Sequence, residues 1–557
     1  MRFASSVVCL ILFAALIMSS CKNQPNSSSQ TLSNADLLRG DIILCSGNQF
    51  GEVSFASSCD YSVRENFNLA VSLLHSFEYA EAEKVFAKVI DADPDCAMAY
   101  WGVAMSIYHS LWAPPGVELL KKGARLLDIA ASVPKTEREQ EYLEAIGLYY
   151  TNWGEYDAQT RARKMADKME AIYRKYPDDT EAAIFYALAL HSVSDPQDMT
   201  YANQRKAGQI LESIFPDNPN HPGIAHYIIH AYDNPVLASK ALSTARNYAK
   251  IAPASAHAQH MPSHIFTRLG LWDESISSNL NSTESAVCYA EQAGFDAHWD
   301  EELHSLDYLV YAYLQKGDNS KANDLNDYLN SIENVYPVNF KDAYALAAIP
   351  ARIVMENKNW GQAANLQLSS IDFPWEDYPW QKSILHFTRA MGASHIGDLD
   401  KAKEETAIID SLHQSLVKTD NQYQAIQVLI QLKTSQAWLA LAEGKDNDAI
   451  TLMEEAADME DKTTKHPVTP CEVIPARELL GDMYYVLNRP AESFAAYQLD
   501  LQSHPYRFNG IYGAALAAKT SGNKAAATRY FNELTELSNF DSDRMEIKEA
   551  NSYLSAL

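Results

Sequence analysis

The stretch "FNLAVSLLHSFEYAEAEKVFAKVIDADP", residues 67–94, decides how the whole chain folds. Apolar residues recur in it at helical spacing on both sides of the short break "SFEY". The small residues Ala70 and Ala82 stand where two helices would face each other, and Pro94 closes the segment. The stretch therefore predicts a helical hairpin, whose two helices pack closely because the facing side chains are small.

The same frame returns along the chain with a period of about 34 residues. It is clear in "GDLDKA" at 397–402, in "EGKDNDA" at 443–449, and again around Gly522 and Phe531. This pattern resembles the tetratricopeptide repeat. The resemblance implies an all-α tetratricopeptide-repeat solenoid, a right-handed superhelix of about a dozen hairpins, with a short disulfide-containing cap at its N-terminal end.

Composition agrees with an extended array and narrows the expected partners. The chain has 557 residues, of which 47% are apolar, and this is far more than one compact core requires. It carries 45 basic against 72 acidic residues, a formal net charge of −27, with no clustered stripe of Lys and Arg. We therefore expect no nucleic-acid partner, and membrane contact only through an N-terminal anchor.

The N-terminus reads as an export signal. The apolar run "VVCLILFAALIM" at 7–18 is too short to remain in a bilayer, and "SSC" follows it. This resembles a bacterial lipoprotein box with Cys21 as the acylated residue, which implies a lipid-anchored protein of the bacterial cell envelope, facing the periplasm or the surface. A secreted protein cut nearby is the alternative. The expected divisions are a signal peptide (1–20), a flexible tether (21–36), a cap (37–62), a histidine-rich half of the solenoid (63–335) and a C-terminal half (336–557).

The predicted envelope location makes disulfides expected, because disulfides form in oxidising compartments. Cys45 and Cys59 are predicted to form a disulfide that holds the cap to the main body. Cys96, Cys288 and Cys471 are expected to be single buried thiols, and no C-x-x-C motif is present.

Histidines are the most informative side chains in the chain. "HPGIAHYIIH" at 221–230 places His226 and His230 four residues apart, and His260 and His264 repeat that spacing 34 residues later. The resemblance to tetratricopeptide repeats implies that these side chains lie on first helices, which line the concave groove. The residues expected to line the groove and bind a ligand there are His75, His109, His191, Asp233, His257 and Arg268.

Two imidazoles at positions i and i+4 share one helix face and can reach one ion. Pairs on adjacent packed helices can therefore converge on one metal centre or on two close ones. Without a thiolate in the set, Zn, Cu, Ni and Fe all remain candidates. Pro262 predicts a bend beside His260. The predicted ligands are His226, His230, His260, His264, His304 and Asp307, with Asp233 as a residue that could orient an imidazole.

The same motif resembles a group of uncharacterised bacterial envelope repeat proteins, through stretches such as "HMPSHIFTRLGLWDES" at 260–275. That resemblance implies no activity. The chain has no H-E-x-x-H, G-x-S-x-G, phosphate-loop or dinucleotide motif. The first hypothesis is a lipid-anchored solenoid whose groove binds a transition metal and a peptide or small molecule. The alternatives are a metal-dependent hydrolase or oxidoreductase, with Glu301 or Glu302 as general base, and a plain protein-interaction scaffold without metal.

Overall fold

A computed structural model describes residues 35–43, 45, 49–111, 114–369, 371–419, 421–538, 542 and 544–557. The predicted signal peptide and Cys21, the predicted acylation site, lie outside these residues. Within them, no helix is both long enough and apolar enough to cross a membrane.

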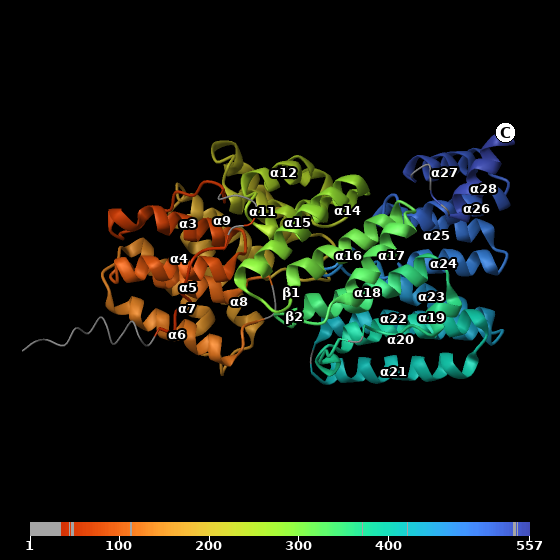
Figure 1. Cartoon of the computed structure of the whole chain (residues 1–557), viewed down its shortest axis with the longest axis horizontal. Helices are drawn as coiled ribbons and strands as arrows, with labels where there is room; N and C mark the ends of the chain where they lie inside the picture. Colours follow the sequence, from red (N-terminus) through yellow and green to blue (C-terminus); the bar gives the residue numbers. More distant parts are fainter. Residues whose placement is uncertain are drawn as a thin grey trace, which may run out of the picture.

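Helices make up most of the described chain and follow one another as hairpins, from the red and orange end of Figure 1 to the blue end. Successive helices pack on each other along the whole array. The hairpins of the first half are α3 (Arg64–His75) with α4 (Tyr79–Ala92), α5 (Ala97–Tyr108) with α6 (Val117–Ser132), α7 (Glu137–Tyr150) with α8 (Ala158–Lys175), α9 (Thr180–Ser192) with α10 (Ala202–Ile214), α11 (Pro222–Tyr232) with α12 (Ala238–Ile251), and α13 (Ala256–His260) and α14 (Pro262–Leu269) with α15 (Trp272–Ala293).

The second half continues the array and ends in a single helix, α28 (Met545–Ser555). Its hairpins are α16 (Asp300–Gln315) with α17 (Asn319–Ser331), α18 (Phe340–Glu356) with α19 (Trp360–Ala364), α20 (Pro379–Ile396) with α21 (Leu399–Lys418), α22 (Gln422–Ala442) with α23 (Asp446–Glu460), α24 (Ala476–Val486) with α25 (Pro490–Ser503), and α26 (Phe508–Thr520) with α27 (Lys524–Leu537). The predicted all-α solenoid of about a dozen hairpins is confirmed.

Short elements complete the described chain. Three 3₁₀ turns lie at η1 (Tyr61–Val63), η2 (Phe215–Asp217) and η3 (Trp375–Asp377). Two short strands, β1 (His298–Trp299) and β2 (Val335–Tyr336), pair in parallel, with His298 opposite Val335.

Glycines end several first helices, as the repeat frame predicts. Gly270 follows α14 with a φ of 67°, and Gly317 follows α16 with a φ of 69°. The left-handed region costs glycine little because it has no Cβ, so the chain can reverse there into the second helix.

The N-terminal segment is an extended strap that contains two disulfide-bonded cysteines, but its disulfides pair differently from the prediction. Cys45 is bonded to Cys288, and Cys59 is bonded to Cys96. The predicted Cys45–Cys59 pairing is therefore wrong, and two of the expected free thiols are engaged. Both bonds tie the strap to helical hairpins, because its extended course carries the two cysteines to different parts of the body.

A long loop connects the two halves across the array. Residues 461–475, between α23 and α24, contain Lys465, whose ammonium lies 2.9 Å from Asp233 at the end of α11. The phenol of Tyr308 on α16 donates to the carbonyl of Thr469 in the same loop, at 3.1 Å. This connecting loop therefore reaches the histidine-rich part of the chain from 232 residues away.

Replacing Gly392 by alanine is expected to destabilise the second half of the solenoid by about 1–3 kcal/mol, the usual cost of overpacking a core. Gly392 lies on α20 against α19, and an added Cβ would stand 2.2 Å from the backbone nitrogen of Ala364. Backbone cannot swing aside as a long side chain can. Urea unfolding followed by circular dichroism measures the effect, and the control is Gly361→Ala, where an added Cβ meets open space. Equal loss in both variants would contradict the packing account.

A second prediction concerns acid stability. The His395 ring lies between the rings of Trp360 and Trp438, with centroid distances of 3.7 and 4.2 Å, and burial lowers its pKa to about 4. Below the ordinary pKa of about 6.5 the unfolded chain takes up a proton that the folded chain refuses. The free energy of unfolding should therefore fall between about pH 6.5 and 4, by up to about 1.4 kcal/mol per pH unit from this residue. Urea unfolding at several pH values should show a shallower fall for His395→Phe, and parallel curves would contradict this assignment.

Candidate metal centre

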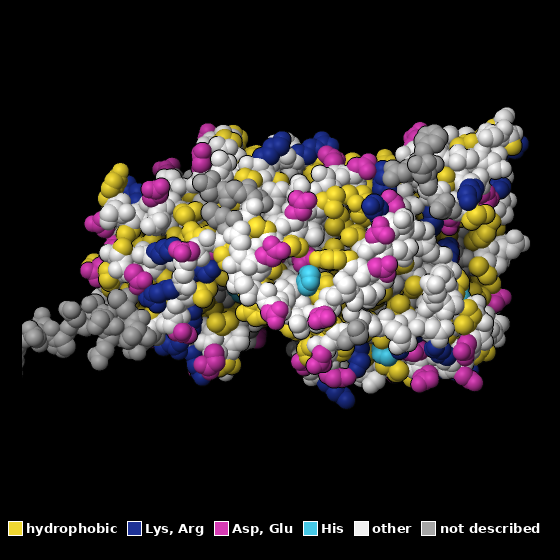
Figure 2. All heavy atoms as spheres, in the orientation of Figure 1, with side chains coloured by type: hydrophobic (Ala, Val, Ile, Leu, Met, Phe, Trp, Pro, Cys, Tyr) yellow, Lys and Arg dark blue, Asp and Glu magenta, His cyan; other side chains and the backbone are white. Residues whose placement is uncertain are grey.

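Six histidines meet in the interior of the array, between α11 and α16. His226 and His230 come from α11, His257 and His260 from α13, His264 from α14 and His304 from α16. Their exposed fractions are all 3% or less, and little histidine is visible on the face drawn in Figure 2. The expectation of an open groove is therefore wrong for these residues. They lie among tightly packed helices, so solvent does not reach the rings freely.

The six rings form two groups. The first histidine group is His226, His230 and His257, and the second histidine group is His260, His264 and His304. In each group one ring nitrogen per residue lies within 4.8 Å of the other two. Each predicted i, i+4 pair thus stays together and gains one further imidazole from a helix later in the chain.

The two groups adjoin each other. The ring centroids of His230 and His264 are 6.1 Å apart, and those of His257 and His260 are 6.4 Å apart. α13 and α14 are separated at Met261, beside Pro262, although Met261 itself keeps helical backbone angles.

Hydrogen bonds assign the tautomer of His226. Its Nδ1 lies 2.7 Å from the backbone carbonyl oxygen of His75, which can only accept, so Nδ1 carries the proton. Its Nε2 therefore presents a lone pair, 3.2 Å from Nε2 of His257.

In the second histidine group, two imidazoles likewise carry their proton on Nδ1 and a lone pair on Nε2. Asn279 donates its Nδ2 to the carbonyl of Ser275, so its Oδ1 faces Nδ1 of His260 as an acceptor at 2.6 Å. Nδ1 of His264 donates to the carboxylate of Asp233 at 2.9 Å. Both Nε2 atoms are thus left as acceptors, and they lie 3.0 Å from each other.

Two facing lone pairs, as in the second group, repel unless a cation lies between them. Two nitrogens bound to one tetrahedral ion, each about 2.0–2.1 Å from it, lie about 3.3 Å apart. The observed separations of 3.2 and 3.0 Å are close to that value. Outer partners that protonate Nδ1 and aim Nε2 inward are also typical of metal-bound histidine.

Two further imidazoles have buried nitrogens that no described protein group satisfies. Neither ring nitrogen of His230 has a hydrogen-bond partner, and Nε2 of His304 has none. Leaving such an atom buried and unpaired costs about 1–3 kcal/mol. The residues therefore fit a metal ion, which would use these nitrogens as its third ligands.

Five of the six rings are held in the neutral form that a metal ion requires. Burial, and next the neighbouring imidazole of His257, lower the pKa of His226 well below its usual value. Burial likewise lowers the pKa of His230, His260 and His304. Burial lowers the pKa of His264 to about 4, against the opposing pull of Asp233. An ion at this site would therefore displace few protons at neutral pH.

Asp233 acts as the outer partner predicted for it. Burial alone would raise its pKa, but Lys465 and Arg268 outweigh burial and hold the pKa well below its usual range. The Nε of Arg268 donates to Asp233 at 3.0 Å. The carboxylate therefore stays ionised and keeps His264 in one orientation.

The predicted carboxylate ligand and one predicted base lie elsewhere. Asp307 accepts from Arg352 at 3.1 Å and does not join either histidine group. Glu302 is engaged by His298 at 2.9 Å and by the phenol of Tyr328. Glu301 does approach the site, with Oε2 3.6 Å from Nδ1 of His257 and Oε1 bound to Lys341.

The other groove candidates have separate surroundings. His75 is buried and shares Glu181 with His221, at 2.9 and 3.0 Å. His109 ends α5 and stacks on Tyr79, with a centroid distance of 4.4 Å. His191 lies beside the first group, 6.0 Å from His230 between centroids.

Sequence reasoning missed three contributors to the site. Asn279 and Lys465 carry no motif, because they reach the site through helix packing and through the connecting loop. His257 was assigned to the groove, although it joins His226 and His230. The run of three histidines within eight residues indicates this role for His257, because one i, i+4 pair accounts for only two of the three.

Comparison with known proteins gives only distant structural likenesses. No protein-family model matches the chain, and no curated protein matches it. Among solved structures, the human IFIT1 dimer with m7Gppp-AAAA has 12% identity and a TM-score of 0.36, covering 88% of this chain and 91% of that one. The Naa15/Naa10 complex bound to HypK-THB has 12% identity and a TM-score of 0.24, covering 88% and 90%. The described residues by themselves show an all-α solenoid of helical hairpins.

The comparison also corrects one expectation. A monomeric IFIT1 mutant with Gppp-AAAA matches 84% of this chain and 95% of its own, at 12% identity and a TM-score of 0.33. IFIT1 was thus solved with capped RNA, so the exclusion of nucleic acid is contradicted. Net charge averages over the whole surface, and it does not describe the local surface that a partner would meet.

Proposed function

We propose that this chain binds transition-metal ions at two adjacent three-histidine centres inside its helical array. His226, His230 and His257 would hold one ion, and His260, His264 and His304 would hold the other. The observation that carries the proposal is the facing of two Nε2 lone pairs in the second group, at 3.0 Å, beside the matching approach of two Nε2 atoms in the first group, at 3.2 Å. Bound there, an ion would act as a Lewis acid with a fourth coordination position open to a small ligand.

The chain's own residues would prepare both centres. The carbonyl of His75, the amide of Asn279 and the carboxylate of Asp233 hold three imidazoles with their acceptor nitrogens inward. All-imidazole ligation suits Zn, Cu, Ni or Fe. Two disulfides support an oxidising compartment, in keeping with a lipid-anchored envelope protein.

Catalysis is the second candidate, and one observation favours it. Three ligands per ion leave a coordination position open, as in catalytic rather than closed structural sites. Glu301 is buried beside His257 and could accept a proton near the first group. Its other oxygen is held by Lys341, which fixes the carboxylate in place.

Metal analysis of the purified protein tests the proposal. The mature chain is stripped of metal, reconstituted separately with Zn²⁺, Cu²⁺, Ni²⁺ and Fe²⁺, and analysed for bound metal per chain. The double variant His226→Ala/His264→Ala removes one ligand from each centre, and it is expected to bind two fewer ions than the wild type. The matched control is His413→Ala, on α21, which should match the wild type.

Equal metal content in the double variant and the wild type, with every ion, would contradict the proposal. Circular dichroism of both variants separates loss of ligands from loss of fold.

A further inference from the structure

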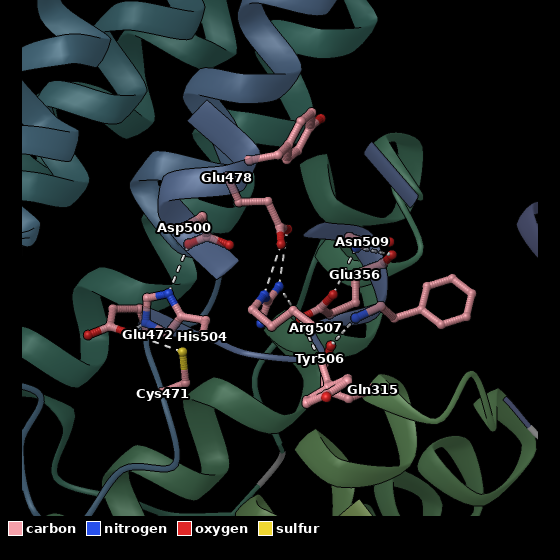
Figure 3. Close-up of polar contacts among 12 residues, drawn as sticks. Gln315, Glu356, Cys471, Glu472, Glu478, Asp500, His504, Tyr506, Arg507 and Asn509 are labelled. Carbon is pink, nitrogen blue, oxygen red and sulfur yellow. Dashed lines mark hydrogen bonds and ion pairs between the residues drawn. The ribbon is translucent and has the colours of Figure 1, made fainter. Parts of the chain in front are cut away.

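A second cluster of metal-ligating side chains lies at the other end of the connecting loop, away from the two histidine groups. Cys471 and Glu472 belong to the loop, and His504 follows α25. One ligand atom of each lies within 4.8 Å of the other two. Figure 3 shows the three side chains together, with Asp500 bound to the imidazole.

The distances within this cluster are those of groups that share a centre. The sulfur of Cys471 is 3.0 Å from Oε2 of Glu472, and Nε2 of His504 is 3.3 Å from the same oxygen. A thiolate, an imidazole and a carboxylate are the three ligand types that zinc takes in proteins.

An outer partner orients the imidazole, as in the histidine groups. Nδ1 of His504 lies 2.8 Å from Oδ1 of Asp500, one turn earlier on α25. With Nδ1 bound to Asp500, Nε2 of His504 faces the carboxylate of Glu472 at 3.3 Å. This carboxylate–histidine arrangement recurs behind metal-bound imidazoles.

Backbone contacts hold the two loop residues rigidly in place. The guanidinium of Arg352, itself fully buried, donates to the carbonyls of Cys471 and Glu472 at 2.8 and 2.7 Å. The phenol of Tyr344 also donates to the carbonyl of Cys471, at 3.3 Å. A loop fixed in this way can present ligands at constant geometry, which a metal site requires.

Access and redox state are also compatible with a metal. A cavity lined by Glu460, Glu472 and Gln431 lies against the carboxylate side of the cluster. Cys471 is a free cysteine, whereas Cys45, Cys59, Cys96 and Cys288 are in disulfides.

From these observations we infer that Cys471, Glu472 and His504 form a third metal site, which takes Zn²⁺ or a similar ion that accepts sulfur. Binding releases the thiol proton of Cys471 and any proton carried on Nε2 of His504. Three protein ligands leave one position open toward the cavity. The site shares no ligand with the histidine groups, so it stands or falls independently of them.

Cobalt substitution tests the inference because, of the three proposed metal sites, this is the one with a sulfur ligand. The full mature chain, stripped of metal, is titrated with Co²⁺ and followed for the thiolate-to-cobalt charge-transfer band in the near ultraviolet. The wild type should develop the band, and Cys471→Ser should lack it. The variant His226→Ala/His264→Ala should keep it, because imidazole ligands give no sulfur band.

A second variant, which keeps all three ligands, separates loss of the metal site from misfolding. Asp500→Asn leaves all three ligands and should weaken Co²⁺ binding at this band by about 10- to 100-fold, the usual effect of losing an outer partner. Absence of the band in the folded wild type, or its persistence in Cys471→Ser, would show that the cluster is only a buried ion-pair network. Loss of metal from the histidine groups with the band intact would instead overturn the proposed function alone.

Discussion

Arg507→Met is expected to lower the free energy of unfolding by about 3–5 kcal/mol, the range measured when one partner of a buried ion pair is removed. Arg507 is fully buried and donates to Glu478 at 2.9 and 3.1 Å and to Glu356 at 2.8 Å (Figure 3). Its remaining nitrogen donates to the phenol of Tyr311 at 3.1 Å. Methionine would leave two buried carboxylates without their shared cation.

Urea unfolding followed by circular dichroism measures this loss, and Arg489→Met is the matched control. Arg489 pairs with Glu492 at 3.0 Å, but its side chain is 41% exposed. A pair screened by water is worth at most about 1 kcal/mol. If Arg507→Met costs no more than Arg489→Met, the buried network contributes nothing that the surface pair lacks. Adding Glu478→Gln to Arg507→Met should recover part of the loss, since it removes one uncompensated charge.

The second large effect concerns the separation of the two histidine groups. His230→Ala is expected to remove the ion of the first group and leave the second occupied, and His304→Ala is expected to do the reverse. Each of these two residues supplies the third ligand of its group. Its removal should lower the affinity of that group for its ion by more than the roughly 10- to 100-fold expected for loss of an outer partner. The reason is geometric, because no other described histidine nitrogen lies within the same group.

Competition titrations with a chromophoric chelator measure the affinity of each remaining ion. Single substitutions that abolish both ions together would mean one shared centre rather than two. His413→Ala serves as the control for loss of a histidine outside the groups.

The helical array could be predicted from sequence because its signals are local. Ala70 and Ala82 mark a close helix contact, and glycines such as Gly270 end first helices with positive φ. These features depend on residues a few positions apart. The same locality explains why His226 with His230, and His260 with His264, were correctly paired.

The third imidazoles were less accessible to such reasoning. His257 and His260 stand on the same short helix, yet one turns toward α11 and the other toward α16. The split depends on where successive helices lie in space. The repeat pattern predicts the helix face on which a side chain lies, but it does not predict which of two neighbouring helices contacts that face.

Long-range connections explain the remaining differences. Cys45 reaches Cys288 because the strap crosses several hairpins, and nothing in the spacing of the cysteines encodes that path. Lys465 meets Asp233 through a loop that returns across 232 residues. Asp307 was assigned to the metal by its position in the repeat, but Arg352 on the next first helix takes its carboxylate instead.

Anomalous diffraction from metal-loaded crystals tests the central claim most directly. Data collected at the absorption edge of the bound ion are predicted to show two peaks in the interior of the array. One should be enclosed by His226, His230 and His257, and the other by His260, His264 and His304. Crystals soaked in metal that show no anomalous peak within either histidine group would contradict the account.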